Sequence, residues 1–452
     1  MKHYITLLLI LSVTFAQAQE KKWTLKECVD YAIENNINIQ QTQLDNELIA
    51  IDKKDAFGNF LPSINANASH NWNIGLNINP ITNVAATQTF QNTGIGLNVG
   101  IDIYNGLQNQ NRLRRANLAQ IAAQYQLTKM KDDISLNVAN AFLQILFNKE
   151  NLKVQQEQLL NNKKQKERTQ TLVDAGSVPR GDLMDMTATV ATSEQAVVVA
   201  KNVLLISRLS LAQLLQLDDF KSFDIAETDY SLTESETMLQ TPETIYEKAK
   251  EQRVELKIAR ANLEVAQKDI DIARGAFQPS LRGFYSFSSR ATNSDRISSD
   301  GNGNFIIQGP APIFDQFSEN KGNAFGIQLN IPILNGFSVR NNVERSKIRF
   351  SRSKVAVNQQ EIDLKRNVFT AFTDANGALN AYEAAVTALK ARKESYKYAQ
   401  ERFDVGLLNA FDLNQSQTLF ANAESEVIRT KFDYIFRVKV VEFYFGIPIA
   451  GR

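Results

Sequence analysis

Side chains that commonly carry enzymatic chemistry are scarce in this sequence. The 452 residues include two histidines and one cysteine. His3 lies in a segment that we expect to be removed, which leaves His70 as the remaining imidazole. This scarcity argues against most histidine-based catalysis and most zinc sites. We find no nucleophile–base arrangement, phosphate-binding loop or metal cluster, and therefore predict neither an enzyme nor a cofactor or metal site.

The single cysteine and the charge balance narrow the class of protein further. Cys28 has no partner for an intramolecular disulfide, and its spacing to Ala32 in a short apolar helix pattern predicts a core position. A long chain without disulfides must be held by packing, association or membrane insertion. The chain carries 50 basic and 49 acidic residues, so it has no overall charge that would attract nucleic acid.

The first 18 residues have the pattern of a signal peptide. Lys2 gives a positive start, residues 5–15 form a short apolar run, and Ala16-Gln17-Ala18 is a small-x-small cleavage site. We therefore expect an exported protein whose mature form begins near Gln19. No run of about 18 consecutive apolar residues follows, so we expect no transmembrane helix.

The sequence repeats itself, and the two copies differ in length at one place. Val173-Asp174-Ala175-Gly176 is followed 230 positions later by Phe403-Asp404-Val405-Gly406. Upstream the spacing is 217, as between Pro62 and Pro279, so the second copy carries 13 extra residues between Ser280 and Gly336. Each copy reads as helix, strand, strand, very long helix, turn and helix. We expect a first repeat at 19–217, a linker at 218–240, a second repeat at 241–447 and a tail at 448–452.

Four segments alternate between apolar residues and small or polar ones, as strands with two different faces do. We expect strands at about 63–75, 93–104, 280–289 and 324–334, although Phe284 breaks the alternation in the third. Ten-residue strands with one apolar face fit a transmembrane β-barrel, and a half-buried soluble sheet would give the same pattern. In a barrel the lipid-facing residues would be Ile64, Trp72, Leu97, Val99, Ile101, Phe325, Ile327, Leu329 and Ile331.

The number of strands requires association if the sheet lies in a membrane. Four strands cannot close a barrel, and lipid cannot hydrogen-bond to an open sheet edge. Two copies would supply eight strands and three would supply twelve, and bacterial barrels begin at about eight. The loops near 77–92 and 290–323 would lie outside the cell. The second loop, which contains Asp300-Gly301-Asn302-Gly303, accounts for the difference in length.

Long helical hairpins are expected after each pair of strands, at about 107–217 and 337–445. No glycine or proline lies between Gly106 and Gly176. A helix of about 66 residues would be roughly 100 Å long and would need a partner along its length. An a/d seam supplies one in the second copy, formed by Val368, Phe372, Ala375, Leu379, Tyr382, Val386 and Leu389.

Turn chemistry marks the far end of each hairpin. Gly176 and Gly406 stand where a helix C-cap needs a residue with positive φ. Asp182 and Asp412 follow six residues later and are the expected N-caps of the return helices. Asp412 and Gln415 also fit a capping box.

With these elements in place, the chain resembles the TolC family of outer-membrane factors over essentially its whole mature length. The resemblance rests on the duplicated order of elements and on the strand entries Phe60-Leu61-Pro62-Ser63 and Phe277-Gln278-Pro279-Ser280. It also rests on the turn Arg402-Phe403-Asp404-Val405-Gly406-Leu407, with Asp412-Leu413 after it. The family implies an α+β membrane protein with a duplicated helix–strand–strand–helix–helix repeat. Its homotrimer would form a twelve-stranded outer-membrane β-barrel that continues into a long periplasmic α-helical coiled-coil barrel.

The resemblance also implies a passive exit duct in a tripartite efflux or type I secretion system. An inner-membrane transporter (RND, ABC or similar) and a periplasmic adaptor would deliver the substrate, and outer-membrane lipid would surround the barrel. The adaptor would dock at the hairpin tips, which here are Ala175, Gly176, Ser177, Val178, Val405, Gly406 and Leu407. The first tip departs from the second, because Pro179 and Gly181 replace Asn409 and Phe411. The residues of the aperture gate stay unassigned.

The alternative to a duct is a periplasmic coiled-coil scaffold or adaptor without a pore. Adaptors also carry helical hairpins, but they lack duplicated strand hairpins with lipid-facing alternation, and conductance in planar bilayers separates the two. The cargo stays open between drugs, metal ions and polypeptides, because a passive duct selects little.

Overall fold

The computed structural model describes residues 22–78, 85–218, 220, 222–227, 235–299, 301 and 305–449. The expected signal peptide, parts of the linker and tail, and Asp300, Asn302 and Gly303 lie outside the described residues. The chain separates into two compact units. The hairpin unit comprises residues 1–46, 124–258 and 357–452, and the sheet unit comprises residues 47–123 and 259–356.

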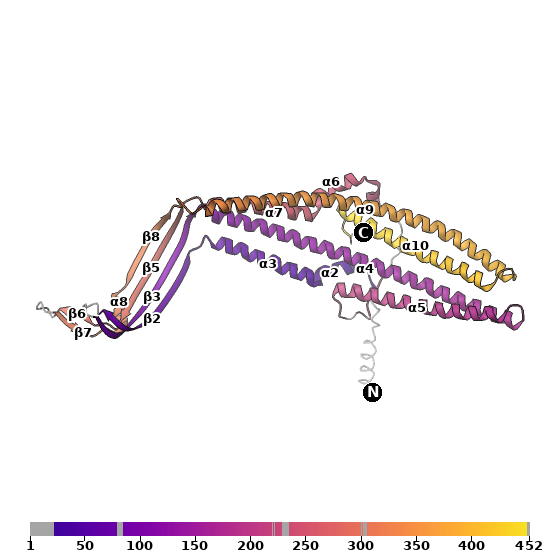
Figure 1. Ribbon diagram of the computed structural model, residues 1–452, viewed down its shortest axis with the longest axis horizontal. Coiled ribbons are helices and arrows are strands. Elements are labelled where there is room, and N and C mark those ends of the chain that lie inside the picture. The colour runs from indigo at the N-terminus through magenta and orange to yellow at the C-terminus, as the bar shows by residue number, and fades with distance from the viewer. Residues whose placement is uncertain are drawn as a thin grey trace, which may run out of the picture. The chain divides into compact units, whose positions relative to one another are not determined.

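The helices repeat in length as well as in order (Figure 1). α2 (Leu25–Asn35) and α6 (Pro242–Gln252) each have 11 residues, and α3 (Ile37–Gly58) and α7 (Val254–Gly275) each have 22. α4 (Gln108–Asp174) and α9 (Ser338–Asp404) each have 67, and α5 (Arg180–Leu215) and α10 (Ala410–Phe445) each have 36. The first two pairs are 217 positions apart and the last two are 230 apart. The two spacings of the sequence are therefore also the spacings of the fold.

A single extended residue interrupts the helix between α2 and α3, and another between α6 and α7. Asn36 and Arg253 occupy these equivalent positions, with ψ of 127° and 129°. The buried Asn36 amide donates to the carbonyl oxygen of Leu214 at 2.9 Å. The buried Arg253 guanidinium donates to Glu255 at 2.9 Å and lies 3.8 Å from the centre of the Phe443 ring. These contacts hold the short helices in the hairpin unit.

The sheet unit contains one antiparallel sheet of four strands, in the order β2 (Ser63–Ile78), β3 (Ala85–Asn105), β5 (Ser280–Thr292) and β8 (Gly322–Asn330). β3 of the first copy pairs with β5 of the second, so the boundary between the copies lies inside the sheet (Figure 1). Among the described strands, β2 and β8 each have one neighbour and form the two edges. Each edge presents unpaired N–H and C=O groups that another strand can satisfy.

Some strand bounds differ from the sequence predictions. Residues 85–92, which the sequence predicts as loop, belong to β3, because backbone pairing with β2 continues past the apolar alternation. The predicted loop at 290–323 contains a small hairpin of β6 (Arg296–Ser299) and β7 (Phe305–Gln308), and the helix α8 (Ile313–Glu319). Ile331, predicted within a strand, lies beyond β8, because Pro332 cannot donate to the ladder and pairing ends at Asn330.

The main core of the hairpin unit gathers residues from α2, α4, α5 and the linker. Phe142 and Leu211 have no exposed surface, and Cys28 is buried among them as the sequence predicts. In the linker, β4 (Asp224–Ile225) pairs in parallel with β1 (Lys22–Trp23), and the short 3₁₀ helix η1 (Glu236–Leu239) follows. The buried ammonium of Lys149 lies 2.7 Å from an Asp224 carboxylate oxygen, which ties the linker to α4.

The count of consecutive apolar residues predicts no transmembrane helix, whereas one helix passes a test based on length and average composition. Among the described residues, α5 is long and apolar enough to span a membrane by length and composition, with a mean hydropathy of 1.5 over 18 residues. Counting consecutive apolar residues misses it, because Lys201, Asn202 and Arg208 interrupt the run. Only 28% of that window is buried within the chain. The large apolar side chains exposed on α5 are Met184, Val198, Val199, Val203, Leu205, Ile206 and Leu209.

Candidate functional site: the hairpin tips and the sheet

The two helical hairpins end in turns of the same geometry. Residues 175–179 connect α4 to α5, and residues 405–409 connect α9 to α10. Gly176 and Gly406 have φ of 69° and 77°, a left-handed conformation that glycine adopts without steric cost. In both turns the N–H groups of the glycine and of the next residue donate to carbonyls of the preceding helix at 2.8–3.0 Å. This is the Schellman motif, so both glycines cap their helices as the sequence predicts.

The predicted N-caps, in contrast, are wrong in both tips. The N-cap of α5 is Pro179 and that of α10 is Asn409, so Asp182 and Asp412 lie three residues further on, in the first helical turn. The Asn409 side-chain oxygen accepts a hydrogen bond of 2.8 Å from the Asp412 N–H, whereas Pro179 makes no side-chain cap. Asparagine caps a helix as well as aspartate does, so the earlier residue takes the position. Both aspartates still favour the positive end of the helix dipole.

A groove of about 390 Å³ lies between the two tips of one chain. The predicted docking residues that line this groove are Ser177, Val178, Gly406 and Leu407. The predicted docking residues that are exposed on the turns without lining it are Ala175, Gly176 and Val405. Sequence reasoning did not identify Leu172, Leu408 and Asn409 as groove residues. The sequence pattern of one hairpin does not show which residues of the other hairpin lie next to it.

Apolar contacts join the two hairpins near their tips, and an aromatic contact joins the two helices of the second hairpin. Met186 of α5 is buried together with Phe403 of α9 and Leu413 of α10. Tyr396 stacks on Phe420 with 5.6 Å between the ring centroids, and burial raises the pKa of the Tyr396 hydroxyl. The groove is therefore bordered by a packed contact between the copies.

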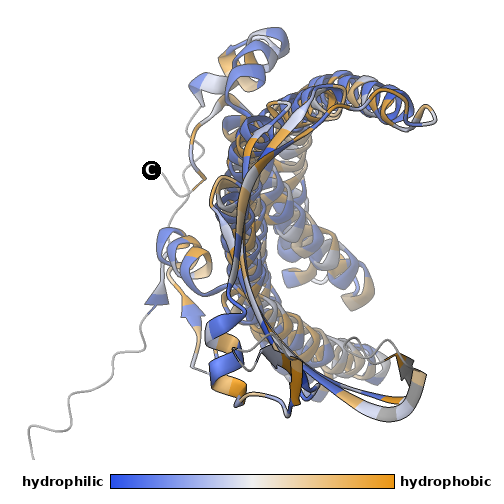
Figure 2. Cartoon of the chain, turned by 90° about the vertical axis from the view of Figure 1, so that its left-hand side faces the viewer, coloured by the Kyte–Doolittle hydropathy of each residue, from blue (hydrophilic) through white to orange (hydrophobic). Residues whose placement is uncertain are grey.

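The strand register separates apolar from polar side chains across the whole sheet. Directly opposed residues share a face. One row of opposed residues is Ile64, Val99, Tyr285 and Phe325. The adjacent row, on the other face, is Ser63, Gly100, Phe284 and Gly326. Figure 2 shows the resulting alternation of hydrophobic and hydrophilic residues along the strands.

The predicted lipid-facing residues share the first of these faces, with one exception. The register places these residues there: Ile64, Trp72, Leu97, Val99, Ile101, Phe325, Ile327 and Leu329. The exception is Ile331, beyond the end of β8. Within the chain, Phe325 is 83% exposed and Ile64 is 64% exposed, so this apolar surface has no cover of its own.

The second face carries mainly amide, hydroxyl and glycine positions. Arg282 lies there with its guanidinium 4.0 Å from the Asp102 carboxylate. Phe284, which breaks the alternation, occupies this face above Gly326, where an added Cβ would be 3.0 Å from its ring. The missing side chain of Gly326 thus makes room for the aromatic ring. A polar face behind an apolar one is typical of the wall of a water-filled membrane barrel.

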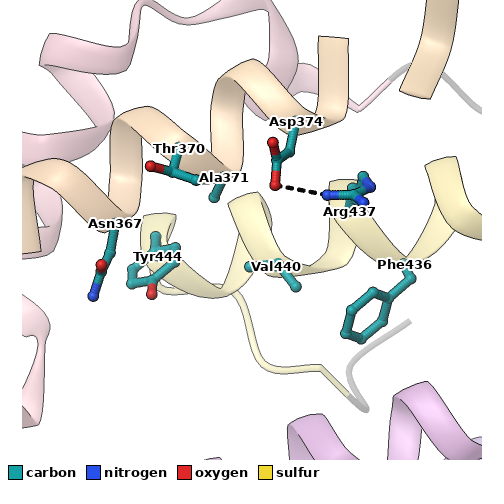
Figure 3. Close-up of a pocket in the computed structure, with 8 residues that line it drawn as sticks. All are labelled: Asn367, Thr370, Ala371, Asp374, Phe436, Arg437, Val440 and Tyr444. Atoms are coloured by element: carbon teal, nitrogen blue, oxygen red, sulfur yellow. Dashed lines mark hydrogen bonds and ion pairs between the residues drawn. The ribbon is translucent and has the colours of Figure 1, made fainter. Parts of the chain in front are cut away.

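A second hollow, of about 290 Å³, lies between α9 and α10 in the hairpin unit (Figure 3). Arg437 of α10 donates to Asp374 of α9 at 2.7 Å and to Asp433 of its own helix at 3.0 Å. Tyr444 lines the same hollow, and burial raises the pKa of its hydroxyl. The residues drawn in Figure 3 contain no nucleophile–base arrangement, and their contacts hold the two helices together.

Solved structures with a similar fold include outer-membrane proteins. VceC of Vibrio cholerae superimposes with a TM-score of 0.76 over 94% of this chain and 96% of its own, at 14% identity. The CmeC outer membrane channel of Campylobacter jejuni matches with a TM-score of 0.76 over 93% and 85%, at 19% identity. A membrane protein of Pseudomonas aeruginosa matches with a TM-score of 0.77 over 95% and 91%, also at 19% identity. The chain therefore shares the fold of these membrane proteins.

The family follows from the sequence itself. The model of the outer membrane efflux protein family matches residues 29–216 and 245–435, which follow the two copies of the repeat. The chain therefore belongs to the outer membrane efflux protein family. No curated protein matches the chain significantly. The resemblance seen in the sequence is confirmed, and with it the prediction of an outer-membrane efflux channel, reaching into the periplasm, rather than an enzyme.

Proposed function

We propose that three copies of the chain form the exit duct of a tripartite efflux or type I secretion system. The observation that carries the proposal is the four-stranded sheet with one apolar face, one polar face and two open edges, β2 and β8. Three copies would join edge to edge into a twelve-stranded barrel, in keeping with the family resemblance. Its apolar face would contact outer-membrane lipid and its polar face would line the lumen.

An inner-membrane transporter and a periplasmic adaptor would deliver the substrate, and the adaptor would dock in the groove between the tips. The walls of this groove combine apolar Leu172, Val178 and Leu407 with the carboxylates of Asp182 and Asp404. Leu407 is 69% exposed, so most of its apolar side chain is open to a partner. Such a surface fits the end of a helical hairpin that offers apolar side chains and a cation.

Leu407→Glu tests the docking while channel formation is followed separately. The variant should conduct in planar bilayers like the parent. Cells that rely on it should nevertheless lose tolerance to substrates within a panel of drugs, dyes and metal ions. Ala391→Glu introduces the same charge at an exposed position of α9 away from the groove, and should leave tolerance intact. Full tolerance with Leu407→Glu would argue against docking at the tips.

A further inference from the structure

The contact that joins the two copies within one chain is very close. Where β3 leads into α4, a Cβ added at Gly106 would lie 2.0 Å from the carbonyl oxygen of Gly275, at the end of α7. A Cβ added at Gly275 would lie 2.4 Å from the carbonyl oxygen of Gly106. The two backbones therefore touch, and neither position accepts a side chain.

Two side-chain pairs extend this contact. Arg115 of α4 forms an ion pair with Asp269 of α7, with 2.6 Å between Nε and Oδ1. The Tyr104 hydroxyl of β3 donates to the side chain of Gln278, which follows α7. In each pair the first residue belongs to the strand and long helix of the first copy, and the second residue belongs to the second copy.

The same glycines recur at the free edges of the sheet unit. Gly336 is equivalent to Gly106 at the spacing of 230, and Gly58 is equivalent to Gly275 at the spacing of 217. Gly336 also repeats the φ of Gly106, 57° against 58°. Within the chain, however, a Cβ at Gly336 or Gly58 would meet no atom within 4 Å. Each edge thus carries one side of the contact seen between Gly106 and Gly275, and among the described residues no atom lies against it.

The ion pair recurs in the same way. Arg345 and Asp52 are the equivalents of Arg115 and Asp269, at the same two spacings. Both side chains are exposed, and within the part of the chain that the structure describes neither takes part in an ion pair. An arginine and an aspartate thus lie at equivalent places on opposite edges, and neither has an ion-pair partner among the described residues of its own chain.

The third pair changes both of its members together. Leu334 and Leu61 stand at the positions equivalent to Tyr104 and Gln278. The hydrogen-bonded pair within the chain is therefore replaced by two apolar residues at the free edges. The two leucines are 90% and 57% exposed in the single chain. Exposed apolar side chains of this kind are typical of a surface that contacts another chain.

We propose that these edges bind a second chain of the same protein, with Gly336 and Arg345 of one chain against Gly58 and Asp52 of the next. The proposal rests on the association in the proposed function and identifies the contact that achieves it. This joint between chains has the same contacts as the joint between the two repeats of one chain. A ring of chains can therefore close through equivalent contacts. The joint also covers exposed apolar side chains of α3 and α9, namely Leu48, Ile51 and Ile348.

The same two spacings define the strand register between copies. Within the chain, Val99 of β3 lies opposite Tyr285 of β5. Their equivalents are Leu329 of β8 and Ala68 of β2, so Leu329 of one chain lies opposite Ala68 of the next chain. Both residues are on the apolar face, so this register keeps that face continuous across the joint. A shift of one residue would break the continuity.

Disulfide formation between copies tests this register. Leu329→Cys combined with Ala68→Cys should give covalently linked dimers and trimers on oxidation, reversed by a reductant. Leu329→Cys combined with Ala66→Cys is the matched control, because Ala66 shares the same face two residues away and lies beyond the reach of a disulfide. Cys28 is buried, and single-cysteine variants control for it. Stronger linking of the Ala66 variant, or no linking in a trimeric protein, would overturn the proposal.

Charge reversal tests the ion pair independently. Arg345→Asp should abolish the detergent-resistant oligomer, and the double variant Arg345→Asp with Asp52→Arg should restore it. The matched pair Arg115→Asp with Asp269→Arg acts within one chain, so its effect on melting should not depend on protein concentration. A trimer that persists in Arg345→Asp, or one that the second substitution fails to restore, would contradict the contact.

The failure of this inference is distinguishable from failure of the proposed function. A parent protein that is monomeric and does not conduct in bilayers would remove the duct itself. A conducting trimer in which the Leu329 and Ala68 cysteines do not link would leave the duct intact and remove only the assigned joint.

Discussion

Arg168 of α4 forms an ion pair with Asp404 of α9, with 2.6 Å between Nη1 and Oδ1. The pair joins the last turns of the two long helices, one from each copy, and Asp404 also lines the groove between the tips. The repeat does not reproduce this pair, because Tyr398 stands at the position equivalent to Arg168. The ion pair therefore distinguishes the first tip from the second.

Removing this ion pair should loosen the tips without unfolding the chain. Arg168→Ala breaks a partly exposed pair, which costs about 0–1 kcal/mol. We expect a melting temperature near that of the parent and a higher resting conductance in planar bilayers, because the two tips can separate. The double charge reversal Arg168→Asp with Asp404→Arg should return the conductance to the parent value. An unchanged conductance in Arg168→Ala would show that the pair does not restrain the tips.

Two equivalent glycines should respond differently to alanine. Gly106→Ala drives a methyl group into the backbone of Gly275 and should prevent the single chain from folding. Gly336→Ala has open space within the chain, so only its left-handed φ opposes it there, at about 1–2 kcal/mol. That chain should show the helical circular dichroism of the parent but fail to associate. Normal association of Gly336→Ala would contradict the inferred joint.

Arginine substitutions should distinguish the two faces of the sheet. Phe325 lies on the apolar face and Ala324 on the polar face of the same strand. Arginine on a lipid-facing position costs about 2–4 kcal/mol near the bilayer midplane. We therefore expect Phe325→Arg to lower the denaturant midpoint in vesicles, and Ala324→Arg to leave it nearly unchanged. The opposite order would reverse the assignment of the lumen.

The raised pKa of Glu424 predicts that the stability of the hairpin unit depends on pH. Burial, and then the negative charge of Glu157, raise the pKa of Glu424. The carboxylate therefore opposes folding above its raised pKa, and the penalty disappears below the unfolded value of about 4.3. Glu424→Gln should raise the melting temperature at pH 7.5, and the gain should vanish as the pH falls below about 4.3.

Glu426, on the same helix, is the control of opposite sign. The hydrogen bond from Arg429 lowers the pKa of Glu426, so its contribution is stabilising above the unfolded pKa and is lost as the pH falls through the lowered value. Glu426→Gln should therefore lower the melting temperature slightly at pH 7.5, because the pair is exposed. Equal shifts for the two variants would show that burial does not set the acidity of Glu424.

The sequence predicted the elements well where a long-range spacing could be read directly. Gly176 and Gly406 marked both hairpin ends, because glycine is the residue that a left-handed C-cap requires. The N-cap of α10 was predicted wrongly, because both Asn409 and Asp412 are good caps and composition alone does not choose between them. The N-cap of α5 was predicted wrongly, because Pro179 takes that position without any side-chain cap. The continuation of β3 through 85–92 was missed, because backbone pairing does not depend on apolar alternation.

The candidate site was predictable only in part for a related reason. The tip residues follow from turn chemistry within one hairpin. The groove arises from packing between Met186 and Phe403, which lie in different copies, and no local periodicity reports such a contact. The apolar surface of α5 was likewise hidden, because interruptions by Lys201 and Arg208 break a consecutive count but not a windowed average.

The most direct test of the account is single-channel recording of the purified protein in planar bilayers, with its oligomeric state measured in the same preparation. We expect a trimer that gives uniform stepwise conductances, because three open four-stranded sheets close into one barrel. A protein that remains a soluble monomer and gives no conductance steps would contradict the account and favour a scaffold without a pore.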